Sequence, residues 1–292
     1  MNRDALPTID DIRAAPARIA PFAQVTPVLR SDALDALTGT RLHFKCENLQ
    51  RGGAFKFRGA CNAVWALDDD QAARGVLTHS SGNHGNALAL AAATRGIAAH
   101  VVIPEGAVRA KVEAIERAGA TVHRCAPTQA AREAMAAQLQ RETGAVFVHP
   151  YADTRVMAGQ GTLALELLQQ TPNLDALITP VGGGGLASGV AIAAHAIDPE
   201  LVLFGAEPLG ADDAAQSLAQ DRRITTIVPD TVCDGLRALV GERNLDALRM
   251  HHVEIITVTD DETIAAMQLL WTALKQVVEV SRATVLAAIL KQ

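Results

Sequence analysis

The fold is decided by residues 75–104, which read GVLTHSSGNHGNALALAAATRGIAAHVVIP. The short apolar runs 75–79 and 98–104 predict strands, and the Ala- and Leu-rich segment 85–94 between them predicts a helix. A polar turn, 80–84, separates the first strand from the helix. A strand, a helix and a second strand in this order form the repeating unit of a parallel sheet that helices cover on both faces.

The same alternation continues toward the C-terminus. The predicted helices cover residues 108–118, 128–143, 159–169, 186–197 and 282–290, and the predicted strands cover 121–124, 145–149, 176–181, 201–207 and 253–258. The series restarts after residue 150, so the pattern predicts an α/β chain with two lobes. In open parallel sheets of this kind, ligands bind beyond the carboxyl ends of the strands.

The composition is that of a soluble globular enzyme. The chain has 292 residues, of which 49% are hydrophobic and 20% charged, and this length is sufficient for two domains. The formal net charge is -6, and no basic stretch is interleaved with aromatic residues. We therefore expect neither nucleic acid nor a membrane surface among its partners.

Cysteine usage and the N-terminus indicate a cytoplasmic protein. Cys46, Cys61, Cys125 and Cys233 are scattered and form no C-x-x-C pair, which argues against a disulfide framework or a zinc site. The first residues lead into no apolar segment of the signal-peptide type, and no apolar run is long enough to cross a bilayer.

Lys56 stands between Phe55 and Phe57 in the glycine-rich stretch 52–60. An amine held against apolar side chains loses its charge more easily, so its pKa falls. The neutral amine is a nucleophile, and its commonest use is a Schiff base with a carbonyl substrate or with pyridoxal phosphate (PLP). The alternative is a lysine that packs its stem on the aromatic rings and keeps its head in water.

The four glycines Gly182–Gly185 lie between a predicted strand and a predicted helix. Consecutive glycines let backbone N–H groups converge on an anion, and the helix N-terminus adds positive potential, which predicts a phosphate site. The segment also fits the dinucleotide pattern G-x-G-x-x-A through Gly182, Gly184 and Ala187, with Glu207 as the ribose-binding acid. A nucleotide-binding oxidoreductase and a plain tight turn are therefore both alternatives.

Two further polar clusters follow predicted strands. The turn 80–84 offers hydroxyl, amide, imidazole and helix N-terminal groups to a carboxylate, although an ordinary capped helix would look the same. Glu207, Asp212 and Asp213 offer carboxylate oxygens to a hard divalent cation, whereas the alternative is a solvated acidic loop.

Taken together, these motifs resemble one family. They read KCENLQ at 45–50, FKFRGA at 55–60, SSGNH at 80–84, AGQGT at 158–162 and PVGGGGL at 180–186. The chain is similar over nearly its whole length to the PLP-dependent serine/threonine dehydratases and serine racemases, of PLP fold type II. An oxidoreductase of the dinucleotide-binding type requires neither Lys56 nor the serine-rich turn, so the resemblance favours PLP.

The resemblance implies a two-lobed, tryptophan-synthase-β-like α/β fold with twisted, largely parallel sheets covered by helices. It implies a large PLP-binding domain made of residues 1–74 and 152–292. A small domain, residues 75–151, would carry the loop that binds the substrate carboxylate. The resemblance also implies a homodimer.

It further implies roles for individual residues. Lys56 and Ser81 match the catalytic residues, Ser81 serving the face of the cofactor opposite the lysine. The residues matching the cofactor site are Phe55, Lys56, Asn83, Gly182, Gly183, Gly184, Gly185 and Leu186. The residues matching the substrate-carboxylate site are Ser80, Ser81, Asn83 and His84. Those matching a site for Mg²⁺, Mn²⁺ or Ca²⁺ are Glu207, Ala211 through its carbonyl, and Asp213.

The implied reaction is a β-elimination from a small β-hydroxy amino acid, L-serine or L-threonine, that yields a 2-keto acid and ammonia. The amine of Lys56 would remove the Cα proton, and PLP would delocalise the electrons. Serine racemisation, with Ser81 as the acid on the second face, and dehydration of 3-hydroxyaspartate are the alternatives within the family.

Two departures from the family pattern lead to further expectations. Arg282 stands where the family has a small residue, so we expect it to crowd the cofactor edge or to meet an acidic substrate. Relatives continue beyond the position of Gln292 with a turn whose serine hydrogen-bonds the pyridine nitrogen. Unless Ser281 replaces that serine, we expect weak activity or a PLP-binding protein without catalysis.

Overall fold

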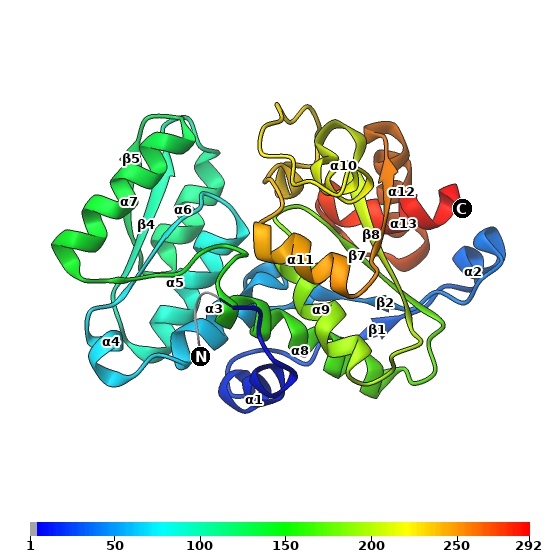
Figure 1. Ribbon diagram of the computed structural model, residues 1–292, viewed down its shortest axis with the longest axis horizontal. Coiled ribbons are helices and arrows are strands. Elements are labelled where there is room, and N and C mark those ends of the chain that lie inside the picture. The colour runs from blue at the N-terminus through cyan, green and yellow to red at the C-terminus, as the bar shows by residue number, and fades with distance from the viewer. Residues whose placement is uncertain (1–4) are drawn as a thin grey trace. The chain divides into compact units, whose positions relative to one another are not determined.

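The computed structural model describes residues 5–292, which group into two compact units (Figure 1). Unit 1 holds the residues up to Val25 together with Leu49–Thr162, and unit 2 holds Thr26–Asn48 and Leu163–Gln292. The unit that contains residues 75–151 is larger than the predicted small domain. The reason is that helices α3 (Lys56–Trp65) and α5 (Asn83–Arg95) pack against each other within unit 1. The predicted domain boundaries remain a prediction.

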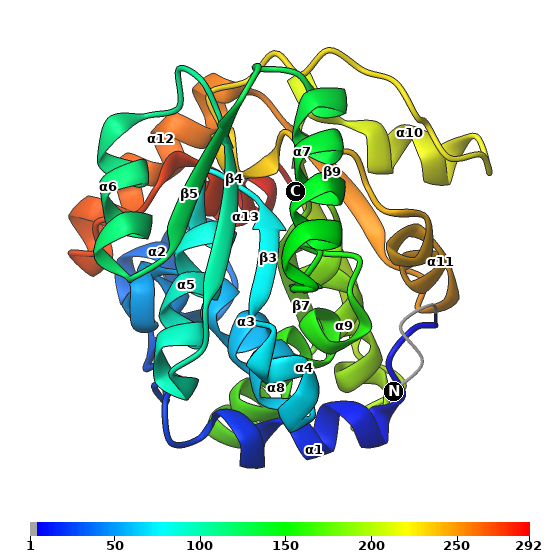
Figure 2. The same ribbon diagram turned by 90° about the vertical axis from the view of Figure 1, so that its left-hand side faces the viewer.

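Unit 1 contains a four-stranded parallel sheet in the order β5-β4-β3-β6, three strands of which are labelled in Figure 2. Its strands are β3 (Val76–His79), β4 (Ala99–Pro104), β5 (Thr121–Cys125) and β6 (Val146–Phe147). Helices α5 (Asn83–Arg95), α6 (Arg109–Arg117) and α7 (Gln129–Thr143) alternate with them. The predicted alternation of strands and helices is thus confirmed, with shifts of only a few residues at most ends.

Alternate side chains of β4 pack on opposite faces of this sheet, as the pleat requires. Val101 and Ile103 contact the core beneath α5 and α6, where Ile115 is also buried. Val102 contacts the second core, beneath α7, together with Leu139. Helices therefore cover both faces, which explains why the strands are continuous apolar runs.

The remaining helices of unit 1 enclose the core around Phe57 and Leu88. They are α1 (Ile9–Ile19), α3 (Lys56–Trp65), α4 (Asp69–Ala73) and the first part of α8 (Thr154–Gln170), with a 3₁₀ turn at Arg51–Gly53. Helices α3 and α8 cross at backbone distance, since a Cβ on Gly159 would lie 2.6 Å from the Arg58 carbonyl oxygen. Only glycine permits so close a crossing.

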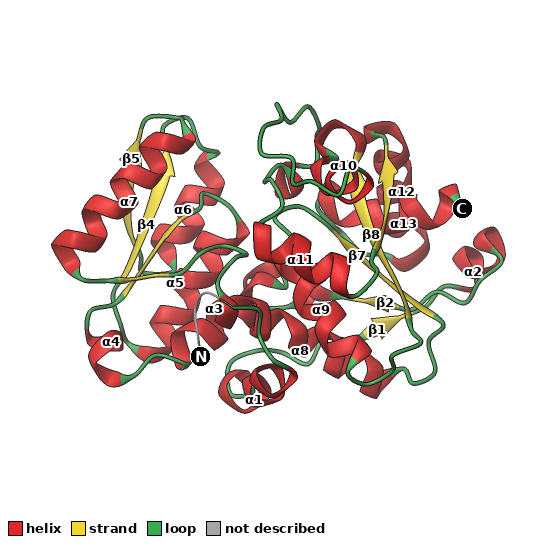
Figure 3. Cartoon of the chain, viewed as in Figure 1, coloured by secondary structure: helices red, strands yellow, loops and turns green. Residues whose placement is uncertain are grey.

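Unit 2 contains a three-stranded parallel sheet in the order β7-β8-β9 and a small antiparallel ribbon (Figure 3). The strands are β7 (Ala176–Pro180), β8 (Val202–Pro208) and β9 (Glu254–Val258), and the ribbon pairs β1 (Val28–Leu29) with β2 (Phe44–Lys45). Its helices are α2 (Asp32–Thr38), the end of α8, α9 (Gly185–His195), α10 (Asp213–Ala219), α11 (Glu242–Met250), α12 (Asp260–Leu274) and α13 (Val280–Lys291). Short 3₁₀ turns cover Glu47–Leu49, Leu209–Ala211 and Asp234–Leu236.

Helices cover this sheet on both faces as well. Ala206 and Val258 pack with Leu270 of α12 and Leu286 of α13. Leu203 borders α9 on the other face. Within residues 5–292, every helix is too short or too polar to cross a bilayer.

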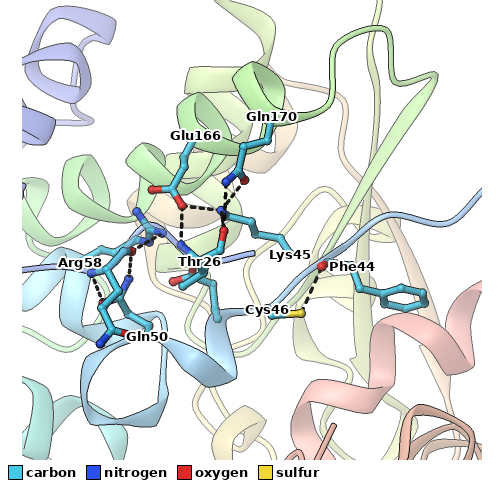
Figure 4. A network of polar contacts seen from close by, with 10 residues as sticks. Thr26, Phe44, Lys45, Cys46, Gln50, Arg58, Glu166 and Gln170 are labelled. Carbon is cyan, nitrogen blue, oxygen red and sulfur yellow. Dashed lines mark hydrogen bonds and ion pairs between the residues drawn. The ribbon is translucent and has the colours of Figure 1, made fainter. Parts of the chain in front are cut away.

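A buried ion pair ties the ribbon of unit 2 to α8 (Figure 4). The Lys45 amine pairs with the Glu166 carboxylate and donates to the Thr26 carbonyl oxygen and to Gln170 Oε1, both at 2.7 Å. A buried ammonium costs free energy unless such partners surround it. The lysine of the KCENLQ motif is therefore structural.

Candidate active site

Lys56 is the first residue of α3 and points its amine at the carbonyl of Pro150, which accepts a hydrogen bond from Nζ at 3.0 Å. Nζ also lies 5.2 Å from the centroid of the Phe55 ring. Burial lowers the pKa of the Lys56 amine to about 8. As its aromatic neighbours suggested, this lysine loses its charge more easily than an exposed lysine.

The turn of residues 80–84 leads into the N-terminus of α5, whose N-cap residue is Gly82. No side chain caps this helix, and a helix N-terminus attracts an anion. The turn folds back so tightly that a Cβ on Gly85 would lie 2.1 Å from the Ser80 carbonyl oxygen. The alternative of a helix with an ordinary side-chain cap does not apply here.

His84 is buried beneath this turn. Its Nε2 lies 3.3 Å from the Val148 carbonyl oxygen, and a carbonyl can only accept, so Nε2 carries the proton. Nδ1 is buried without a hydrogen-bond partner among the described residues. Burial and, secondarily, the positive charge of Lys56 hold the pKa of His84 well below its usual range. The structure thus brings His84 close enough to Lys56 for the charge of the lysine to disfavour protonation of the histidine.

In unit 2, the glycine turn leads from β7 into α9. Gly184 is the N-cap of α9, with φ at +87°, and no side chain caps the helix. A Cβ on Gly184 would lie 2.7 Å from the Cβ of Asn244, so both its conformation and its surroundings exclude a side chain. The Gly183 carbonyl accepts from the Gly241 N–H at 3.2 Å, which fixes the turn. A helix N-terminus lined by glycines provides N–H donors for a phosphate.

Sequence reasoning did not find the residues that support these turns. Pro150 contributes a backbone carbonyl, which carries no sequence signal. Asn244 and Gly241 belong to a segment far along the chain from the glycine turn. They are recognisable only once α9 and α11 are seen to pack together.

The 3₁₀ turn Asp234–Leu236 lies between Ser281 and the glycine turn and contacts both. Its Oγ accepts from the Gly235 N–H at 3.0 Å, and a Cβ on Gly182 would lie 3.4 Å from the Gly235 carbonyl oxygen. A hydroxyl that accepts one hydrogen bond still has its own proton to donate. Whether it serves the cofactor remains a prediction.

The acidic cluster after β8 is buried rather than solvated. Burial raises the pKa of Glu207 to about 8 and that of Asp213 to about 6. Glu207 accepts from the N–H groups of Ala214 and Ala215 at 3.1 and 2.9 Å. Asp213 accepts from the Val240 N–H at 2.7 Å.

Within residues 5–292, no group of three or more His, Cys, Asp and Glu side chains is arranged to hold a metal. The expected cation site has two carboxylates and the Ala211 carbonyl, and Ala211 lies in the turn between Glu207 and Asp213. It remains a prediction.

Comparison with known proteins decides the family. Residues 19–292 match the family described as pyridoxal-phosphate dependent enzymes. The chain is a pyridoxal-phosphate dependent enzyme. The α/β fold and the PLP cofactor expected from the resemblance are thereby confirmed.

Relatives of this PLP-dependent enzyme include a serine racemase, a beta-hydroxyaspartate dehydratase and a threonine deaminase. A serine racemase of Arabidopsis thaliana is 50% identical over 279 residues, which cover 96% of this chain and 84% of the relative. A beta-hydroxyaspartate dehydratase of Paracoccus denitrificans is 47% identical over 286 residues, covering 98% and 91%. The solved structure of a threonine deaminase from T.th. superposes with a TM-score of 0.93 at 42% identity, covering 98% of this chain and 93% of the other.

The residues present fit the cofactor chemically. An aldehyde requires a neutral amine, and burial lowers the pKa of Lys56 to about 8. A phosphate requires N–H donors, and the N-terminus of α9, which no side chain caps, provides them at the glycine turn. The lysine lies in unit 1 and the glycine turn in unit 2.

Proposed function

We propose that this PLP-dependent enzyme removes water from L-serine or L-threonine and releases the 2-keto acid and ammonia. The observation that carries the proposal is the amine of Lys56, whose pKa burial lowers to about 8. A general base works best when its pKa is near the working pH. The relatives named as a dehydratase and a threonine deaminase support elimination as the reaction.

The proposed roles in unit 1 are those that the family resemblance implies. Lys56 holds the cofactor and, once freed, takes the Cα proton of the substrate. Ser80, Ser81, Asn83 and His84 bind the substrate carboxylate, which the uncapped N-terminus of α5 attracts. Phe55 and Asn83 flank the cofactor ring. When bound, PLP supplies the electron sink that makes loss of the Cα proton feasible.

The proposed roles in unit 2 are anchoring ones. Gly182–Gly185 and Leu186 donate N–H groups to the cofactor phosphate. Glu207, the Ala211 carbonyl and Asp213 bind Mg²⁺, Mn²⁺ or Ca²⁺, because two buried carboxylates with raised pKa values gain most from a cation.

Two other reactions at the same site have specific support. Racemisation is supported by Ser81 and by the Arabidopsis relative, and it requires a proton donor on the second face. Dehydration of 3-hydroxyaspartate is supported by the Paracoccus relative. Arg282 gives this second reaction little help, because its Nη2 lies 3.0 Å from Glu279 Oε2, which offsets its charge.

A product assay separates these reactions. The purified holoenzyme is given L-serine, L-threonine or 3-hydroxyaspartate, and 2-keto acid, ammonia and D-serine are measured, with Lys56→Ala as control. Our proposal expects keto acid and ammonia in equal amounts, with the highest kcat/KM for L-serine or L-threonine. D-serine without keto acid would instead support the racemase. Preference for 3-hydroxyaspartate would support that dehydratase, and bound PLP without turnover would support a PLP-binding protein without catalysis.

We also propose that the enzyme is a cytoplasmic homodimer that binds no nucleic acid. The support is the family resemblance, the net charge of -6 and four cysteines that are all buried and unpaired. Light scattering should give twice the 30.7 kDa mass of one chain. A mass of one chain at micromolar concentration would contradict the dimer.

A further inference from the structure

Two histidines of unit 2 face each other at the carboxyl ends of α9 and α11, which Figure 1 labels side by side. His195 is the last residue of α9, and His251 is the C-cap of α11. Their Nδ1 atoms lie 3.0 Å apart, and both rings are half-buried. The proposed reaction uses neither ring, so this pair is unexplained.

The hydrogen bonds determine which nitrogen of His195 carries the proton and where its lone pair points. His195 Nε2 lies 3.0 Å from the Leu201 carbonyl oxygen, and a carbonyl only accepts, so Nε2 carries the proton. In the neutral ring, the lone pair of His195 is then on Nδ1 and points at His251. A backbone carbonyl that holds the far nitrogen in this way is the usual support of a metal-binding histidine.

The surroundings favour a cation between the rings. The carboxyl end of each helix carries partial negative charge, and two such ends meet here. A histidine binds a metal through an unprotonated ring nitrogen.

We propose that His195 and His251 bind one Zn²⁺ or Cu²⁺ ion through their Nδ1 atoms, with water as the other ligands. Imidazole suits both metals. Two nitrogens about 2.0–2.1 Å from a tetrahedral ion lie roughly 3.4 Å apart. The rings must therefore separate by about 0.4 Å from the observed 3.0 Å, and each must turn so that its lone pair points at the ion instead of at the other nitrogen. The Nδ1 proton of His251 moves to its Nε2, so binding releases no net proton.

Binding there would tie α9 to α11, whose opposite ends build the glycine turn. Asn244 of α11 packs against Gly184, and the N–H of Gly241 holds the Gly183 carbonyl. An ion that binds only the folded protein stabilises it. We therefore expect Zn²⁺ to raise the melting temperature of the protein and Mg²⁺, a hard cation, to leave this site empty.

Copper provides the direct test. CuCl₂ is added to the chelator-treated holoenzyme, and electron paramagnetic resonance counts the nitrogens on the bound ion. We expect one Cu²⁺ per chain with hyperfine coupling to two nitrogens. His195→Gln and His251→Gln should each abolish the two-nitrogen signal and the melting shift with Zn²⁺.

The control is a second histidine pair, in unit 1, where His100 Nδ1 lies 3.1 Å from His123 Nε2. It lies on the adjacent strands β4 and β5, and His100→Gln should leave the copper signal unchanged. Loss of the signal in His100→Gln, or its persistence in both other variants, would overturn the proposal. Coordination by oxygen alone in the unmutated enzyme would also overturn it, and that measurement needs no variant.

Discussion

At the scale of single residues, Lys56 titrates differently from an exposed lysine, because burial lowers its pKa from 10.5 to about 8. Only the neutral amine attacks an aldehyde. We expect the rate at which the cofactor-free protein takes up PLP to rise with pH with a midpoint near 8. Stopped-flow absorbance between pH 6 and 10 measures this rate.

The same shift affects stability. From about pH 8 to 10.5, the unfolded chain holds a proton on Lys56 that the folded protein has released, so stability of the cofactor-free protein rises with pH in this window. Lys56→Met should remove both effects and take up no PLP covalently. An uptake midpoint near 10.5 would contradict the placement of the amine.

Glu207 is the opposite case, because its pKa is raised from 4.5 to about 8. Between these values the folded protein holds a proton that the unfolded chain has lost, so stability falls as pH rises. In metal-free protein we expect a loss on the order of 2–4 kcal/mol between pH 5 and 8, measured by urea unfolding.

Glu207→Gln keeps a hydrogen-bond acceptor but cannot ionise. It should at least halve this pH dependence, the rest coming from Asp213, whose pKa is raised to about 6. Mg²⁺ at pH 8 should stabilise the unmutated protein and not the variant. If Mg²⁺ stabilised the unmutated protein and Glu207→Gln equally, the proposed cation site would be wrong.

At the scale of elements, the turn before α9 depends on the conformation of one glycine. Gly184→Ala forces a side chain into the left-handed region and against Asn244. Gly39, the C-cap of α2, has the same conformation but nothing within 4 Å of its Cβ direction. Conformation alone costs about 1–2 kcal/mol at either position, and the contact with Asn244 adds to it only at Gly184.

We therefore expect Gly184→Ala to weaken PLP binding at least tenfold and Gly39→Ala to change it less than twofold. Absorbance titration of the cofactor-free variants measures both. Equal effects of the two substitutions would mean that the glycine turn does not bind the phosphate.

The elements also show where sequence patterns stop being informative. Helix α12 begins at a local sequence signal, because Thr259 and Glu262 form a capping box. Helix α11 was not expected, since Gly241 gives it no side-chain cap and packing against α9 stabilises it instead. Helix α8 begins at Thr154 rather than at the predicted residue 159, because Val156 and Met157 already contribute buried side chains.

At the scale of the whole molecule, both units keep their thiols inside. Cys61 and Cys125 are buried in unit 1, and Cys46 and Cys233 in unit 2. Burial raises the pKa of Cys61 to about 12, and it raises those of Cys46 and Cys233. The thiolate is the reactive form.

In the native protein we expect less than one equivalent of thiol per chain to react with a disulfide reagent within minutes. After unfolding, all four cysteines should react. Because each unit contains buried cysteines, a thiol becomes reactive when either unit opens locally, and the reaction rate therefore measures that opening. Rapid reaction of a whole thiol in native protein would contradict the described packing.

The sequence by itself determined most of the order of strands and helices, and it singled out the two polar or glycine-rich turns and the lysine. Periodicity, glycine and flanking aromatic residues act over a few neighbouring residues, so a local pattern carries them. It also carried the motifs that identify the family. Only the tertiary structure decided three contacts. The Pro150 carbonyl accepts a hydrogen bond from the Lys56 amine, Asn244 packs against Gly184, and His195 contacts His251. These contacts join residues far apart in the chain, and no local pattern encodes which distant backbone or side chain packing will bring within reach.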